Sequence, residues 1–337
     1  MIQSYNPIKY MRYLSKKVKD ILVSLSKKSN VIFALRKYFR AMLTMLAWLD
    51  HLTSKSTGHT YFIQNGSNLN KIFCMAHYSN DSKLDSCDAN ILKKAKELGF
   101  YTILYTNQDS IVSHYVDRII LKPIRGRDAA VLANFAKGLR HLKVEDAVDI
   151  CFMNNSFAWD PQCFEEIYSQ ATSGPKNTIV FPTESCYPSQ HVQPYSLFVS
   201  LDELGLTKFS DSFNWIRAWR FKRTTVVFYE YRLFRVLQQK GWSLLSICDA
   251  KSLFAEYQTL FNLEITFERY GTLDINPTSD LWSVLPKLGL VGVKKQTAIS
   301  LSTAKQTGYQ APFEQEFLKT KFFESVIVQR SGTCSHN

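Results

Sequence analysis

Short apolar runs alternate with helical periods from residue 71 onward, and this alternation constrains the fold more than any other feature of the chain. The run at 71–77 (KIFCMAH) predicts a buried strand, followed by a loop and helix cap at 80–82 and a helical apolar stripe that ends at Gly99. We likewise expect strands at 101–105, 118–121, 147–153 and 178–181, with helices at 129–142 and 161–171. Such strand and helix units predict an α/β fold with a mainly parallel sheet flanked by helices.

The composition is that of a folded protein. The 337 residues are 45% hydrophobic and contain only 13 Gly and 10 Pro, which excludes a disordered chain and allows one large or two modest domains. Seven cysteines without a CxxC pair favour reduced thiols over a disulfide framework. No apolar stretch reaches the ~18 to 20 residues that span a bilayer, and we expect no cleaved signal peptide.

Positive charge is concentrated in the first 50 residues. Ten basic and two acidic residues give this segment +8 of the net charge of +12. Apolar residues recur at helical spacing over 8–25 and again over 31–49, which predicts two basic amphipathic helices. Such helices bind an anionic membrane surface or a partner protein, although their apolar faces could instead pack on the protein's own core.

Several familiar signatures are absent from the sequence. It contains no GxGxxG, GxxxxGK[ST], GxSxG or HExxH, which argues against dinucleotide, P-loop, serine-hydrolase and zinc-protease sites. Zinc-finger spacing, RNP aromatics and a helix-turn-helix pattern are also missing. We therefore predict no nucleic-acid partner.

An ordered set of short segments resembles a known family. The segments are 76–78 (AHY), 124–128 (IRGRD), 153–156 (MNNS), 191–195 (HVQPY), 229–231 (YEY), and 276–278 (NPT) with Trp282. Over roughly residues 70–295 they resemble the rhamnan synthesis F family of bacterial polysaccharide glycosyltransferases, and more broadly the inverting glycosyltransferases of the GT-A fold. The resemblance implies a hexosyltransferase that moves a sugar from a nucleotide-sugar donor to a lipid-linked or growing cell-surface polysaccharide of O-antigen, capsule or rhamnan type.

The resemblance, which does not cover the first 60 residues, and the basic N-terminal helices together predict an organisation and a location. Residues 1–60 would attach the protein to a membrane or partner, 61–270 would form the GT-A-like catalytic domain, and 271–337 would form an acceptor-side segment and tail. The location would be cytoplasmic and peripheral, at the inner face of the plasma membrane.

One departure from the GT-A pattern concerns the metal. That fold normally presents an acidic DxD turn to Mg²⁺ or Mn²⁺, but this chain has no DxD, and Asn155 stands where an aspartate is expected. The cofactor therefore stays open and no metal ligand is assigned. A catalytically inactive glycan-binding or scaffolding module of a polysaccharide assembly complex is the alternative function.

The resemblance assigns roles to individual residues. Glu230, at the head of an expected helix over 231–239, would be the catalytic base. His191 and Gln193 would contact the acceptor or the sugar. The donor would be bound by Arg125, Arg127, Asp128, Asn154, Asn155 and Ser156, and also by His77, Tyr78 and Thr106, which lie at the ends of expected strands.

Most of these residues also have a structural interpretation. Glu230 could complement a helix dipole, and Asp128 could cap the helix that follows the two arginines. His77 could be a core histidine, and residues 154–156 could form a simple Asx turn. The segment that holds His191 could be a loop that enters a buried strand.

Overall fold

The computed structural model describes residues 30–55, 69–79, 83–121, 127–186, 190–261, 264–272, 275–282, 284–295 and 297. Within these residues an eight-stranded sheet has the order β3-β2-β1-β4-β8-β6-β7, with β9 also paired to β6. Strands β3, β2, β1 and β4 are parallel neighbours, as are β6 and β9, whereas β8 runs antiparallel between β4 and β6. The strands are β1 Lys71–His77, β2 Tyr101–Thr106, β3 Arg118–Leu121, β4 Val148–Asn154, β6 Thr178–Ser185, β7 His191–Val192, β8 Ser196–Leu201 and β9 Ser243–Cys248.

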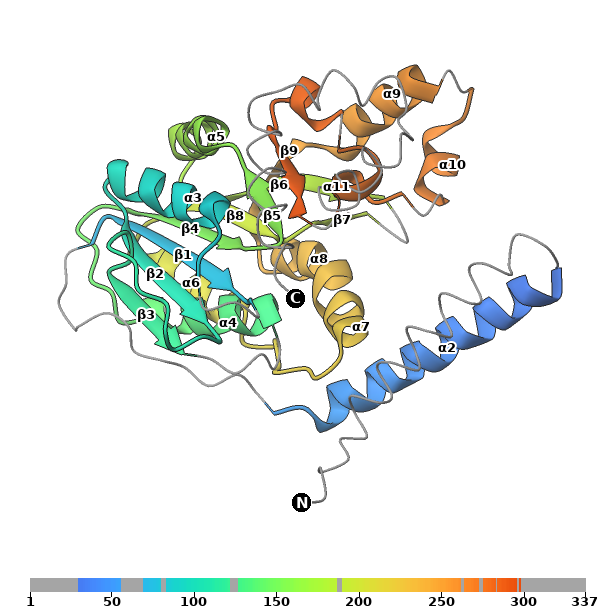
Figure 1. Ribbon diagram of the computed structural model, residues 1–337, viewed down its shortest axis with the longest axis horizontal. Coiled ribbons are helices and arrows are strands. Elements are labelled where there is room, and N and C mark those ends of the chain that lie inside the picture. The colour runs from blue at the N-terminus through green and yellow to red at the C-terminus, as the bar shows by residue number, and fades with distance from the viewer. Residues whose placement is uncertain are drawn as a thin grey trace, which may run out of the picture.

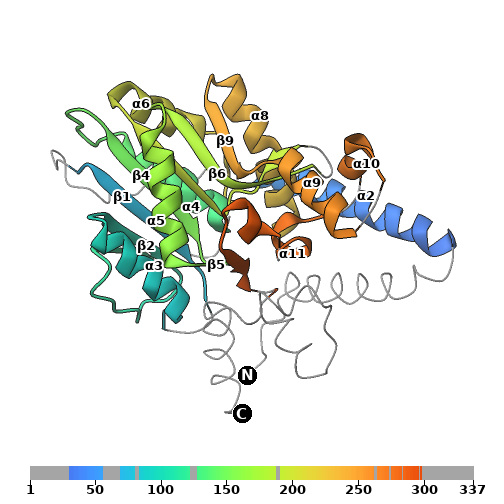
Figure 2. The same cartoon turned by 90° about the horizontal axis from the view of Figure 1, so that it is seen from above.

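Helices cover both faces of this sheet (Figures 1 and 2). Because strand side chains alternate in direction, Ile72 and Cys74 of β1 belong to a core with α4 and α6, while Phe73 and Met75 belong to a second core with α3 and α5. The expected α/β fold, a mainly parallel sheet flanked by helices, is confirmed. The helices are α2 Asn30–Thr53, α3 Ser86–Glu97, α4 Arg127–Leu139, α5 Pro161–Ser173, α6 Glu203–Ser212, α7 Lys222–Thr225, α8 Tyr231–Gln239, α9 Ala250–Phe261, α10 Phe267–Thr272 and α11 Pro277–Asp280.

The start of α3 differs from the expectation. Asp85 caps this helix by accepting a hydrogen bond from the backbone N–H of Asp88 at 2.9 Å, so the cap does not come from residues 80–82, which lie outside the described residues. The predicted end is confirmed, because Gly99 follows the helix with a φ of 82°.

A two-stranded ribbon brings a late part of the chain beside β4. Strand β10, Gly292–Lys294, pairs antiparallel with β5, Phe157–Trp159, which follows the turn at the end of β4. A Cβ atom at Gly292 would lie 2.8 Å from the carbonyl oxygen of Ala158, so only glycine allows this approach.

Helix α2 confirms the second of the two expected N-terminal helices, whereas the first, over 8–25, lies outside the described residues. The C-terminal end of α2 is anchored to the rest of the protein. Asp50 accepts backbone hydrogen bonds from Arg220 and Phe221, and the His51 ring stacks on Phe228 with ring centroids 4.1 Å apart. The rest of α2 extends away from the sheet (Figure 1).

Of the apolar face predicted for α2, the side chains that the structure describes are Met42 and Leu49, which are exposed, and Leu46, which is half-buried. Ala47 and Asp50 are buried, whereas Met42, Met45, Trp48, Leu49 and Leu52 are each at least 45% exposed. No helix among the described residues is both long and apolar enough to cross a membrane.

Candidate active site

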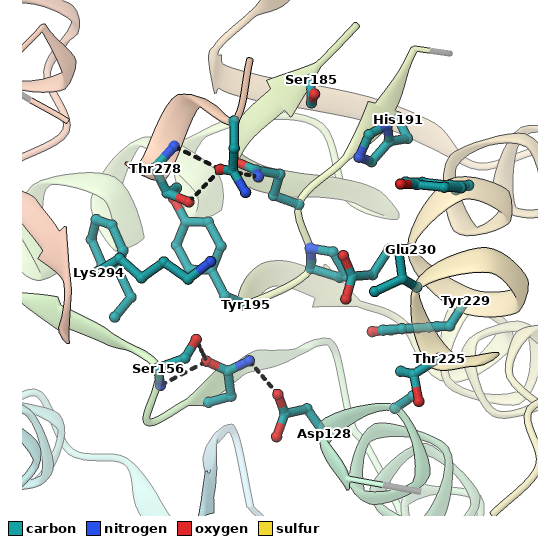
Figure 3. Close-up of a pocket in the computed structure, with 18 of the residues that line it drawn as sticks. Asp128, Ser156, Ser185, His191, Tyr195, Thr225, Tyr229, Glu230, Thr278 and Lys294 are labelled. Carbon is teal, nitrogen blue, oxygen red and sulfur yellow. Dashed lines mark hydrogen bonds between the residues drawn. The ribbon is translucent and has the colours of Figure 1, made fainter. Parts of the chain in front are cut away.

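A pocket of about 340 Å³ lies at the carboxyl ends of β4 and β6 (Figure 3). Asn154 ends β4, Ser185 ends β6, and Asp128 comes from the first turn of α4. Ligand sites of α/β sheets form at this edge. The remaining described lining residues are Ala129, Ser156, Phe157, His191, Gln193, Pro194, Tyr195, Lys222, Thr225, Val226, Tyr229, Glu230, Tyr231, Ile275, Asn276, Thr278 and Lys294.

Glu230 lines the pocket from an irregular helical turn. The predicted helix at 231–239 is present as α8, but it continues a helix that begins at Lys222 and passes through a π-helical segment at Val226–Glu230. Glu230 therefore does not lie at the head of a helix, and the interpretation as a first-turn carboxylate does not apply. Single π turns of this kind occur often at functional sites.

The surroundings of Glu230 shift the pKa of its carboxyl group upward. The side chain is half-buried, and the loss of water around its carboxyl group raises the pKa. The negative charge of Asp128 raises this pKa further, whereas the positive charges of Lys222 and Lys294 lower it. A carboxyl group whose pKa moves toward neutrality is a better proton acceptor for a neutral hydroxyl. Figure 3 shows Glu230 and Lys294 entering the pocket from opposite walls.

Asp128, Asn154 and Ser156 form a chain of hydrogen bonds along one wall. The Asn154 side-chain amide donates to Asp128 Oδ2 at 2.6 Å, and Asn154 Oδ1 accepts from the Ser156 backbone N–H at 3.0 Å and from its hydroxyl at 2.5 Å. These bonds fix the Asp128 carboxylate in the pocket. Asn155 points elsewhere, since its side chain bonds both backbone polar groups of Tyr78, at 3.3 and 3.1 Å.

His191 and Gln193 lie on the opposite wall. Gln193 accepts from Thr183 Oγ1 at 2.8 Å and donates to Asn276 Oδ1 at 2.9 Å, and His191 packs edge-on against Tyr231. The family segments at 191–195, 229–231 and 276–278, far apart in sequence, therefore meet at one pocket.

Four of the predicted donor-binding residues do not line the pocket, and two cannot be placed. His77 and Thr106 are at most 1% exposed, and with Tyr78 and Asn155 they are not among the described lining residues. The positions of Arg125 and of the Arg127 side chain lie outside the described part of the chain. His77 faces Asp88 at 3.7 Å, and burial together with the Lys295 ammonium lowers its pKa to about 4, so it is neutral at pH 7.

The pocket contains polar groups that the sequence did not indicate. Lys222 precedes the π turn and Lys294 ends β10, but neither belongs to a motif. Tyr229 lies within the segment at 229–231, but the resemblance assigns it no role. Its side chain is 2% exposed, and its hydroxyl points into the pocket without a hydrogen-bond partner.

A buried ion cluster holds β10 beside the pocket. The Lys295 ammonium, whose side chain is 7% exposed, lies 2.7 Å from Asp85 Oδ2 and 2.7 Å from Asp88 Oδ1. Its backbone N–H donates to the Ser156 carbonyl at 2.9 Å. Because Lys295 directly follows β10, anchoring it holds the end of this strand, and with it Lys294, beside the pocket.

The side chains that line the pocket do not suit the divalent cation that the GT-A resemblance implies. The described residues contain no group of three or more His, Cys, Asp or Glu side chains that could hold a metal ion. Hard cations prefer several charged oxygen ligands. In this pocket one oxygen of Asp128 already accepts a hydrogen bond from the Asn154 amide, and the pKa of the other carboxyl group, Glu230, is raised. Two lysines also line the pocket, and their positive charges would repel a cation.

Comparison with known proteins does not assign the chain to a family. No protein-family model matches, and no curated protein matches, so the resemblance to the rhamnan synthesis F family stays a prediction. Solved structures do match, including the crystal structure of 2-C-methyl-D-erythritol 4-phosphate cytidylyltransferase from Francisella tularensis, with a TM-score of 0.30 and 10% identity over 57% of this chain and 100% of that chain. A similarity of this size supports no statement about activity.

Proposed function

We propose that the chain is an inverting glycosyltransferase that moves a sugar from a nucleotide-sugar donor to a lipid-linked or growing cell-surface polysaccharide. The observation that carries this proposal is Glu230, a carboxyl group of raised pKa that enters a polar pocket at the carboxyl edge of an α/β sheet. In the proposal, residues 61–270 are the catalytic domain and 271–337 complete the acceptor side.

The chemistry follows from one base and one leaving group. The Glu230 carboxylate accepts the proton of the acceptor hydroxyl while that oxygen attacks the anomeric carbon of the donor sugar. A new carbon–oxygen bond forms on one face as the bond to the diphosphate breaks on the other, and its electron pair goes to the diphosphate oxygen. Asp128, Asn154 and Ser156 hold the sugar hydroxyls, because they form one fixed polar wall.

Turnover of nucleotide sugars tests the function. Purified protein is incubated with a panel of nucleotide sugars and a membrane glycolipid extract, and release of nucleoside diphosphate is measured. We expect Glu230→Gln to lower turnover by at least about 100-fold, the contribution typical of a general base. The matched control Glu264→Gln changes an exposed residue outside the pocket and leaves turnover intact. Wild-type protein that binds glycan without any turnover would support the scaffolding alternative instead.

We further propose that α2 attaches the enzyme to the anionic inner face of the plasma membrane. The net charge of +8 in residues 1–50 complements anionic headgroups, and the exposed apolar side chains of α2 supply area for insertion. Vesicle co-sedimentation should show a preference for phosphatidylglycerol over phosphatidylcholine that Met45→Ser, at a 59% exposed position, weakens. The control Leu204→Ser, at an 83% exposed position on α6, leaves binding unchanged. Equal binding to both lipids would refute the attachment.

A further inference from the structure

We propose that Lys294 and Lys222 bind the diphosphate of the nucleotide donor directly and take the place of a divalent cation. This inference rests on the proposed glycosyl transfer and adds to it the group that receives the leaving charge. When the glycosidic bond to the donor breaks, the diphosphate gains one negative charge. An enzyme that lacks a metal at this point needs fixed cations there.

The two lysines are available for a ligand. Both side chains line the pocket, and neither ammonium group makes a hydrogen bond or ion pair within the described residues. Burial lowers the pKa of Lys294, and the positive charge of Lys222 lowers it further, whereas the carboxyl groups of Glu230 and Asp280 act in the opposite direction. An anion between the two ammonium groups removes this repulsion, which is the electrostatic behaviour expected of an anion site.

Lys294 is also held in a fixed position. It ends β10, which pairs with β5, and the next residue is anchored by two carboxylates at 2.7 Å. A cation that is already in place when charge develops stabilises the transition state without reorganisation. Lys222 is exposed at the rim, where it can meet a ligand that enters from solvent.

Tyr229 is an independent sign that the pocket receives a polar ligand. The side chain is buried, and its hydroxyl lacks a hydrogen-bond partner although it points into the pocket. A buried hydroxyl without a hydrogen-bond partner destabilises the protein unless a ligand or a water molecule supplies that partner. We assign it as a donor to the oxygen atoms of the diphosphate or the adjoining sugar.

The experiment is calorimetric binding of nucleoside diphosphates to the full chain. Uridine, guanosine, cytidine, adenosine and thymidine diphosphates are screened in EDTA and again in Mg²⁺. We expect at least one to bind in EDTA with an affinity that changes less than about threefold in Mg²⁺ and falls as salt rises. Lys294→Met should weaken binding by about 10- to 100-fold, the loss typical of a charge-assisted hydrogen bond.

Controls separate loss of the cation from loss of the fold. Lys287→Met removes an exposed lysine outside the pocket and should leave affinity unchanged. Lys222→Met changes an exposed side chain, so weaker binding by this variant is not a folding defect. Binding only in Mg²⁺, or unaltered binding by both pocket variants, overturns the inference. In either case, sugar transfer that depends on Mg²⁺ and on Glu230 would leave the proposed function standing.

Discussion

Breaking the buried ion cluster at Lys295 should destabilise the protein far more than loss of a surface lysine. The change Lys295→Met keeps the aliphatic volume and removes the ammonium that lies 2.7 Å from both Asp85 and Asp88. Because Asp88 is only 3% exposed, its charge would then be buried without a cation. Removal of one partner of a buried pair costs about 3–5 kcal/mol.

Urea unfolding provides the measurement. With an m value of about 3 kcal/mol/M, a loss of this size lowers the unfolding midpoint by roughly 1 M or more. The control is Lys287→Met, whose exposed ammonium lies 3.8 Å from Glu256 and should contribute less than ~1 kcal/mol. The double variant Lys295→Met with Asp88→Asn should recover part of the loss, because it also removes the stranded charge. Equal midpoints for Lys295→Met and Lys287→Met would refute the reasoning.

Three further predictions concern pH and packing. If burial raises the pKa of Glu230 as described, the rate of sugar transfer should rise with pH through a midpoint above the ordinary 4.5, and a midpoint at or below 4.5 would contradict this environment. Folding lowers the pKa of His77 from 6.5 to about 4. Between pH 6.5 and pH 4 the unfolded chain therefore takes up a proton at this residue while the folded chain does not. The free energy of unfolding should fall by roughly 3 kcal/mol in all as the pH drops through this range. Urea unfolding of His77→Gln should lose that slope, and an unchanged slope would place its origin elsewhere. Gly292→Ala forces β10 away from the Ala158 carbonyl and should lower stability by about 1–3 kcal/mol in thermal unfolding, whereas a neutral effect would show that the ribbon can relax.

The sequence predicted most accurately the elements whose signals are local. The strands at 71–77 and 118–121 have the predicted bounds, and the helix predicted over 231–239 ends where expected, because apolar runs or stripes there end at polar residues or turn residues. Pairing was not accessible in the same way. The antiparallel strand β8 lies between β4 and β6. The sequence did not indicate this position, because the pairing depends on partners tens of residues away.

The candidate site was predicted in part for a similar reason. Short segments around Asp128, Asn154, His191 and Glu230 indicated positions that the fold brings to one pocket. Lys294 and Lys295 could not be separated by sequence, since two adjacent lysines are typical of a solvated surface. Only the tertiary structure buries one against carboxylates and turns the other toward the cavity.

The π turn before α8 makes the orientation of Glu230 depend on a single extra residue. Deleting one residue between Val226 and Glu230 would restore a regular helix, and the parts on either side of the deletion would rotate by about 100° relative to each other. The two parts could not both keep their present packing, so either Lys222 or Glu230 would lose its present direction. The π turn therefore lets side chains from both parts of the helix face one cavity.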